Sequence, residues 1–379
     1  MMLETHGEVC RLGYLRLIAS IAKGNGTTSE LSPDFMASIL EDAVKKSEMV
    51  SNHSPRPDVI GLIRSRVTAR NYVTLARGLK ILDIYGRGLD VNGLIYTSLR
   101  SSSKFDAFLR GETSLTHRDL IMLNQVEKFF FLYVVATQDY LVMPGLIKWL
   151  CSQSTFTRME GMNYIMEELY PQALKILSMT ANKKRRAEIM AKLEEATRYR
   201  EQRLKYASKT EWIRSSLYAK YRHVAPPRLE WLVDLDILER QGRGRYVVTD
   251  LLKNYKDLFT RTLGYSPTSI AHQLFTNIAP LYASYAGKPN RQTIIAELLN
   301  SFHTLSNQER RPVKMQLLEI VTSFRLLENN HLSTPKNVHE AINSLAVVYP
   351  DRIFISPGMD EELYITRIDL DLKEINTQL

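Results

Sequence analysis

Cysteine is almost missing from this chain of 379 residues, which contains only Cys10 and Cys151. Two cysteines are too few for a disulfide framework or a cysteine-based zinc site, so we expect a reducing compartment and two small core residues. Long hydrophobic runs are missing too, because the longest lies between Lys128 and Thr137 and is interrupted at Gln138. That run is well short of a membrane span. The first residues also lack the pattern of a signal peptide, and we expect neither a membrane segment nor export.

The signatures of common enzymes are absent as well. The sequence has no G-x-x-x-x-G-K-[ST] phosphate loop, no G-x-G-x-x-G after a strand, no G-x-S-x-G and no H-E-x-x-H. Asp351 and the triplet from Asp371 to Lys373 imitate the spacing of a metal-dependent nuclease. The residues between them have the pattern of a hairpin, however, and not of the central sheet that would hold both carboxylates on a metal ion. We therefore expect no enzyme, no catalytic residue, no cofactor and no metal.

Positive charge and a sufficient apolar fraction are what the sequence does have. Hydrophobic residues make up 44% and charged residues 24%, which is typical of a chain that folds around a core. Lys and Arg outnumber Asp and Glu by 50 to 41, giving a net charge of +9. Such a balance favours an acidic partner, although a basic protein without one is the alternative. The length suits several modules.

An internal repeat runs through the chain at an offset of 156 residues. Leu79–Gly88 and Leu235–Gly244 both contain an Ile-Leu pair and a Gly-Arg-Gly turn. The same register pairs apolar positions outside the two segments: Val73 with Leu229, Ala76 with Leu232, Val91 with Val247 and Ile95 with Leu251. We interpret the repeat as a duplication of one structural unit.

The second copy shows the predicted unit more clearly. Proline at 226 and 227 suits the first turn of a helix, so we expect a helix of about three turns to begin there, separate from a short helical stretch that ends near His223. Leucines at 229, 232, 235 and 238 give this helix one apolar face. Gly242–Gly244 breaks it, and Arg245–Thr249 has the composition of a strand.

Arg228–Arg240 followed by Gly-Arg-Gly-Arg-Tyr resembles the recognition helix and wing of winged-helix DNA-binding domains. The resemblance implies a helix in the major groove and a hairpin beside it. In its separated winged helices and its lack of an ATPase, the chain is also similar to the archaeal winged-helix initiator proteins, relatives of the eukaryotic replication-licensing factor. The implied function is sequence-specific binding of double-stranded DNA in replication-origin binding and initiation or in transcription regulation. The alternative is a protein-interaction scaffold that uses its winged helices as docking units, like the kleisin-type partners of chromosome-condensing ATPases.

The predicted fold is mainly α with short β-hairpins, as tandem winged-helix domains joined by helical segments. A third unit is indicated by apolar residues at helical spacing after Thr334, followed by two strand-like runs around a turn at Pro357–Asp360. The expected divisions are an N-terminal helical region at 1–112 with the first winged helix at about 56–100, a helical domain at 113–181, a basic linker helix at 182–209, the second winged helix at 210–262, a helical segment at 263–305 and the C-terminal winged helix at 306–379.

The residues that we expect to contact DNA lie off the apolar helix faces, at the wing turns and at the start of the linker. Arginine suits this role because its planar guanidinium binds phosphate or guanine with two hydrogen bonds. The set is Arg70, Asn71, Thr74, Arg77, Arg87, Arg228, Arg243, Arg245, Lys183, Lys184, Arg185 and Arg186.

Two features leave alternatives open. The linker from Lys183 to Lys209 either follows phosphates or only sets the spacing of the modules, at roughly 40 Å if it is one helix. Glu230, Asp234 and Asp236 repel phosphate, so the second copy binds DNA poorly or uses its helix for a protein contact. The expected partners are double-stranded DNA and, in the alternative, other proteins, with no membrane and no indicated oligomeric state. We expect a cytoplasmic, nucleoid-associated protein.

Overall fold

The computed structural model describes residues 5–25, 32–50, 61–86, 88–242, 244–264, 266, 269–309 and 312–370. Within these ranges the protein is mainly helical, and its strands form two small three-stranded antiparallel sheets. The predicted class, mainly α with short β-hairpins, is therefore confirmed.

The N-terminal lobe is a cluster of short helices around a buried first helix. Its elements are α1 (Tyr14–Asn25), α2 (Pro33–Val50), α3 (Arg66–Gly78), α4 (Val91–Thr97), the 3-10 turn η1 (Arg100–Ser102), α5 (Ser103–Leu109) and α6 (His117–Ile121). Helix α3 begins where the Ser65 side chain accepts a hydrogen bond from the Thr68 amide. One face of α3, with Tyr72 and Val73, is buried against the lobe. The turn after α3 is closed by a single bridge between Leu82 and Leu89, so the first predicted wing is a tight turn rather than a strand pair.

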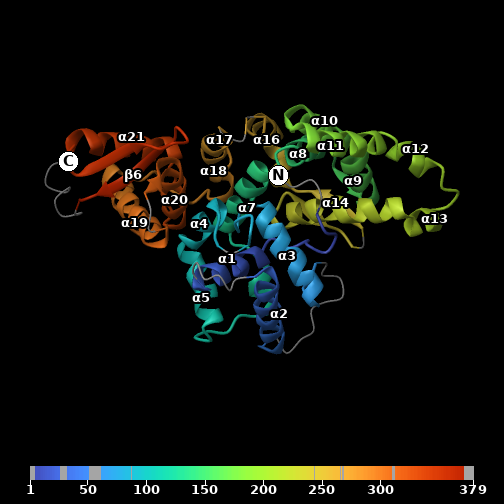
Figure 1. Cartoon of the computed structure of the whole chain (residues 1–379), viewed down its shortest axis with the longest axis horizontal. Coiled ribbons are helices and arrows are strands. Elements are labelled where there is room, and N and C mark those ends of the chain that lie inside the picture. The colour runs from blue at the N-terminus through green and yellow to red at the C-terminus, as the bar shows by residue number, and fades with distance from the viewer. Residues whose placement is uncertain are drawn as a thin grey trace.

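The segment from 155 to 248 forms an arm at one end of the molecule (Figure 1). Its elements are β1 (Thr155–Thr157), α9 (Arg158–Tyr164), the π-helical turn η2 (Ile165–Leu169), α10 (Tyr170–Thr180), α11 (Lys183–Ala196), α12 (Tyr199–Leu204), α13 (Lys209–Arg214), α14 (Ser216–Asp234), β2 (Leu238–Arg240) and β3 (Arg245–Val248). The strand order of its sheet is β1-β3-β2, all antiparallel. Strand β1 was not predicted, since three residues carry too little pattern.

Helix α14 corrects the predicted start of the second unit's helix. Pro226 and Pro227 lie inside it, and Leu238, expected on the same helix, lies in β2. Proline has no N–H, so Pro227 leaves the carbonyl of His223 without its helical donor. The Thr5 hydroxyl takes that place and donates to the His223 oxygen at 2.6 Å. A contact from the far N-terminal segment thus compensates for the proline within α14.

The two repeated segments share their backbone geometry. After α3 and after α14, a residue with positive φ ends the helix, and a glycine with positive φ follows six residues later. The equivalent pairs are Lys80 and Asp236, with φ of 52° and 58°, and Gly86 and Gly242, with φ of 70° and 63°. The helix end and the start of the turn therefore share their positive-φ positions in both copies, while the strand pairing that follows is present only in the second.

The linker expected as one helix is three helices. Breaks at residues 197–198 and 205–208 separate α11, α12 and α13. Buried Ile189 and Ala196 hold α11 against α10, so the chain turns back on itself. The expected spacer of roughly 40 Å is therefore wrong.

The remaining elements form the centre and the C-terminal lobe. The central ones are α7 (Gln125–Gln138), α8 (Met143–Leu150), α15 (Asp250–Asn254), α16 (Lys256–Thr262), α17 (Ile270–Asn277) and α18 (Ala279–Tyr282). The lobe contains α19 (Arg291–Glu309), β4 (Val313–Lys314), α20 (Met315–Glu328), α21 (Pro335–Val348), β5 (Ile353–Pro357) and β6 (Leu363–Ile368). Its strand order is β4-β6-β5. The predicted C-terminal helix and hairpin are confirmed.

Aromatic packing joins the C-terminal lobe to the centre. The ring of Phe324 in α20 lies 5.5 Å from Phe129, 5.6 Å from Phe130 and 4.7 Å from Phe275, measured between centroids. In the described part of the chain, buried apolar residues from Val9 to Leu370 form one contiguous core. No single described helix has both the length and the apolar character to cross a membrane; α7 and α8 meet that test only as a pair, bent by 117°.

Candidate nucleic-acid interface

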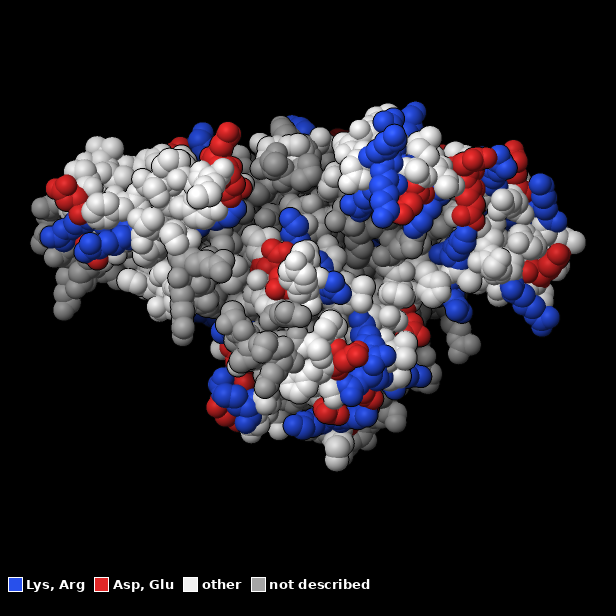
Figure 2. All heavy atoms as spheres, viewed as in Figure 1, with Lys and Arg blue, Asp and Glu red and all other residues white. Residues whose placement is uncertain are grey.

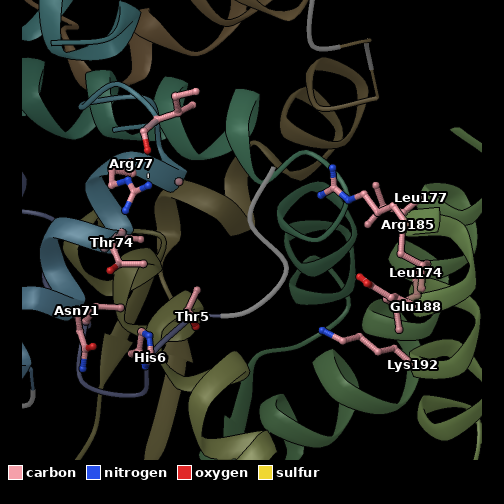
Figure 3. Close-up of a pocket in the computed structure, with 15 residues that line it drawn as sticks. Thr5, His6, Asn71, Thr74, Arg77, Leu174, Leu177, Arg185, Glu188 and Lys192 are labelled. Carbon is pink, nitrogen blue, oxygen red and sulfur yellow. Dashed lines mark hydrogen bonds between the residues drawn. The ribbon is translucent and has the colours of Figure 1, made fainter. Parts of the chain in front are cut away.

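A groove of about 580 Å³ separates α3 from α11. Its α3 wall carries Asn71, Thr74 and Arg77, and its α11 wall carries Arg185, Glu188 and Lys192. In Figure 3 the labelled side chains lie on opposite sides of this space, with Thr5 and His6 between them. Two segments far apart in the sequence thus present polar and basic groups to one cavity.

The α3 wall is the polar face of an amphipathic helix. Arg77 and Thr74 are exposed, while Tyr72, Val73 and Ala76 on the other face are buried. The Arg77 guanidinium donates to the backbone oxygen of Ile84, which holds it beside the turn after α3. Helix α3 therefore places these side chains at fixed positions along the groove.

The α11 wall begins with four consecutive basic residues, Lys183–Arg186. Helix α11 starts where the Asn182 side chain accepts a hydrogen bond from the Arg185 amide at 3.1 Å. All four basic side chains are exposed, and none forms an ion pair with another described residue. In Figure 2, Lys and Arg side chains gather over the place where Figure 1 shows α10 and α11. Exposed cations without carboxylate partners are available to phosphate.

The charges of α11 oppose the helix dipole at both ends. Its first turn contains four basic and no acidic residues, and its last turn contains Glu194 and Glu195 but no basic residue. A helix N-terminus carries partial positive charge and favours anions. This cationic start is therefore unfavourable within the isolated helix, and an anion bound there would relieve it.

A second cavity of about 460 Å³ continues from the groove. It shares Thr5, His6 and Lys192 with the groove and is further lined by Met166, Tyr170, Glu195, Tyr199, Lys220, His223 and Val224. Lys220 pairs with Glu195 and lies 6.0 Å from the centre of the Tyr199 ring. Burial and then the charge of Arg222 lower the pKa of His223 from its ordinary value. Among the described residues, no group of three or more His, Cys, Asp or Glu side chains is placed to hold a metal ion.

Seven of the twelve predicted contact residues gather at this site. Asn71, Thr74, Arg77 and Arg185 line the groove, and Lys183, Lys184 and Arg186 lie beside it at the start of α11. Arg70 is exposed but is paired with Asp34 at 2.5 Å and does not line the groove. Arg245 is exposed on β3, away from the groove lining. Arg87 and Arg243 lie outside the described residues.

The prediction for Arg228 is wrong. Its side chain is fully buried, with Nε and Nη2 donating to Asp139 at 2.7 and 2.9 Å and Nη1 donating to the Val224 oxygen. Burial raises the pKa of Asp139 from its ordinary value, and the charge of Arg228 opposes that rise. Residues 224–232 of α14 are all buried, so this part of the helix has no outward face. It cannot enter a DNA groove in this fold.

The discordant carboxylates of the second copy have partners inside the protein. Glu230 accepts a hydrogen bond from the Tyr246 hydroxyl at 2.6 Å and pairs with Arg240. Asp234 pairs with Arg11 at 2.6 Å, and burial raises its pKa to about 6. These carboxylates fasten α14 to its own hairpin and to the N-terminal segment. Intramolecular pairing therefore accounts for Glu230 and Asp234, and a contact of this copy with another protein stays a prediction.

Sequence reasoning missed the residues between the groove walls. Thr5 and His6 lie there because the N-terminal segment packs across α14, where Trp231 Nε1 donates to the Val9 oxygen at 2.8 Å. No local pattern marks a contact between positions more than two hundred residues apart.

No protein-family model matches the chain, and no curated protein or solved structure is detectably similar to it. The chemistry of the groove is therefore the basis for a functional proposal.

Proposed function

We propose that this protein binds double-stranded DNA through phosphate contacts at the groove between α3 and the start of α11. The observation that carries the proposal is the convergence of Asn71, Thr74 and Arg77 with Arg185 and Lys192 on one cavity. Arginine and lysine bind phosphate oxygens, and amide and hydroxyl groups add hydrogen bonds to the backbone or the bases.

The four cations of the first turn of α11 support the same partner. They oppose the dipole of their own helix and have no described carboxylate partner. A phosphate backbone laid across residues 183–186 supplies the missing negative charge and releases its condensed counterions. The net charge of +9 favours the encounter.

The order of the elements supports winged-helix units within this protein. In the C-terminal lobe, helix α19 is followed by β4, α20, α21 and the β5–β6 hairpin, with strand order β4-β6-β5. The arm has the corresponding strand order β1-β3-β2 after α8, with residues 165–215 placed between α9 and α14. We include this assignment in the proposal, with the DNA contact moved from α14 to the groove.

Salt-dependent binding of labelled duplex DNA tests the proposal. We expect Arg185→Ala with Arg186→Ala to weaken binding and to lower the slope of log K against log salt by about 1.8, or about 0.9 for each lost phosphate contact. The matched control is Arg198→Ala with Arg200→Ala, which removes the same charge from exposed positions outside the groove lining. Its slope should remain that of the parent protein.

Two outcomes contradict the proposal. If the Arg185 and Arg186 double variant keeps the affinity and salt slope of the parent protein, the duplex does not contact these two residues. Equal losses in both double variants mean that only net charge matters and that α11 has no specific contact. Fluorescence anisotropy over a range of salt concentrations distinguishes the cases.

The process that this binding serves can be identified from its target sites. We propose origin binding and initiation or transcription regulation at the nucleoid, and sequencing of the genomic fragments that the purified protein selects separates the two. Discrete fragments beside replication genes favour the first, and fragments at promoters favour the second. Random fragments contradict sequence-specific binding.

A protein-docking role is the second candidate, favoured by apolar side chains on the C-terminal lobe. Val347 at the end of α21 is 81% exposed, and Met359 in the β5–β6 turn is fully exposed. Exposed apolar groups mark protein contacts when they gather in a patch. Binding through apolar contacts depends little on salt concentration, in contrast to binding through phosphate contacts.

A further inference from the structure

The two flanks of α3 are both covered. On one side α2 packs along it, with Arg70 paired to Asp34 at 2.5 Å and Arg66 near Glu41 at 3.5 Å. On the other side lies the groove, with α11 as its far wall. A helix of 10–12 Å diameter enters a major groove about 12 Å wide only when both flanks are open to the two backbones. Helix α3 therefore cannot enter a major groove in this fold.

The groove lining combines cations with apolar surface. Arg77 and Arg185 lie on opposite walls, and Lys192 lies further along α11. The apolar part of the lining comprises Val9, Leu75, Ile84, Leu174, Leu177 and Ile189, of which Ile84 is exposed, Leu177 is half-buried and the other four are buried. Proteins that bind single-stranded DNA use such a combination, because the cations follow the backbone while unpaired bases pack on apolar and aromatic side chains.

The second cavity extends the same chemistry. Tyr170, Tyr199 and Met166 line it as nearly buried side chains, Lys192 supplies positive charge, and the charge of Lys220 is paired with Glu195. The two cavities have volumes of about 580 and 460 Å³, within the range of pockets that hold small ligands. Spaces of this size suit unpaired nucleotides, whereas a base-paired duplex reaches the groove only with phosphates at its rim.

We propose that the groove between α3 and α11 takes an unpaired strand of DNA, so that the preferred ligand is a duplex with a single-stranded extension. The duplex then lies across Lys183, Lys184 and Arg186, while the extension runs between Arg77 and Arg185 toward the second cavity. This inference rests on the DNA binding proposed above and adds the form of DNA that the site selects.

The test compares two labelled probes on the full-length protein. One is a duplex of about 20 base pairs, two helical turns, with an extension of about 10 thymidines, and the other is a blunt duplex of equal total charge. We expect the extended probe to bind at least about tenfold more tightly, which corresponds to one stacked base. Extensions on the 3′ and the 5′ strand are measured separately.

Filling the groove should remove this preference. Thr74→Trp places a large ring in the groove, while the matched control Val67→Trp changes a position on the same helix that is 61% exposed and outside the groove lining. We expect Thr74→Trp to bind both probes equally and Val67→Trp to keep the preference. A second pair of variants repeats the comparison by charge: Arg77→Glu should lose the preference for the extended probe, and its control Arg70→Glu should keep it. Melting curves show that each variant is folded.

The outcomes separate the inference from the proposed function. Equal, salt-dependent binding of both probes overturns the inference and leaves DNA binding standing. Equal weakening of both probes by Thr74→Trp, with Val67→Trp unaffected, shows that paired DNA enters the groove and also overturns it. Absence of salt-dependent binding to either probe overturns the proposed function and the inference together.

Discussion

A buried ion pair between Arg228 and Asp139 links α14 to the end of α7. Arg228 is fully buried and Asp139 is 1% exposed. Their two hydrogen bonds offset a large desolvation cost, and neither charge tolerates the loss of the other. At this scale, stability depends on the pair and not on either residue alone.

Replacing Arg228 by Met should therefore lower the free energy of unfolding by about 3–5 kcal/mol, the cost of leaving a buried charge unpaired. Without Arg228 the pKa of Asp139 in the fold lies still further above its unfolded value. Such a group stabilises the fold at low pH and loses that contribution as pH rises, so the penalty should shrink between pH 7 and pH 5. Urea denaturation at several pH values measures this loss in the free energy of unfolding.

The exposed control Arg77→Met should change stability by less than about 0.5 kcal/mol, and an equally small change in Arg228→Met would contradict this account.

The contrast between Arg77 and Arg228 shows what the sequence reveals at the residue scale. Both are arginines off an apolar helix stripe, and both were predicted to face DNA. Helix α3 has one covered face, so the periodicity places Arg77 correctly. Residues 224–232 of α14 are covered on all sides by segments from elsewhere in the chain, and helical periodicity contains no information about such a cover.

Helix α14 is the element that most depends on a distant segment. Its two prolines remove amide donors in mid-helix, and Thr5 replaces one of them at the His223 oxygen. Gly7 lies so close to the same turn that a side chain there would meet the Arg222 oxygen at 2.4 Å. The N-terminal segment therefore belongs structurally to α14.

A double-mutant cycle tests this dependence. Thr5→Val leaves the His223 oxygen without a donor and should cost about 1–3 kcal/mol of stability. In a Pro227→Ala background the helical amide returns, so Thr5→Val should cost less there. Denaturant unfolding of the four proteins gives the coupling energy. Equal costs in the two backgrounds would show that Thr5 does not substitute for the missing amide.

Elements with strong local signals were predictable from the sequence. The C-terminal helix after Thr334 and its hairpin follow from a proline at the first turn, helical spacing of Val338 and Leu345, and a turn at Pro357–Asp360. The short strand β1 and the course of α14 were not predictable. Strand β1 exists because β3 pairs with it, and α14 continues through its prolines because a distant segment compensates for them.

The units of the whole molecule are interlocked. Residues 5–12 pack on α14, β1 pairs with β3, and Phe324 packs among rings of α7 and α17. The groove depends on the same arrangement, because one wall comes from the N-terminal lobe and the other from the arm (Figure 1). Tandem repeats in a sequence suggest separate modules on a spacer, but the spacer here is a wall of the candidate site.

Dividing the chain at Asn182 tests this interlocking. Fragments 1–181 and 182–379 each lack surfaces that the other covers, so we expect neither to melt cooperatively alone. Expressed together, they should purify as one complex and recover DNA binding, because every contact named above is non-covalent. Trp231→Ala in the second fragment removes a fully buried ring and its hydrogen bond to Val9, and should weaken reassociation.

Tyr255→Ala is the control for that substitution, since Tyr255 is 45% exposed and its removal should leave the complex intact. Cooperative melting of either fragment alone, with full DNA affinity, would mean that the modules are independent after all. The groove needs both fragments, because Arg77 is in the first and Arg185 in the second. Binding that returns only with the reassembled pair would thus place the DNA contact between lobes that the sequence had suggested were separate.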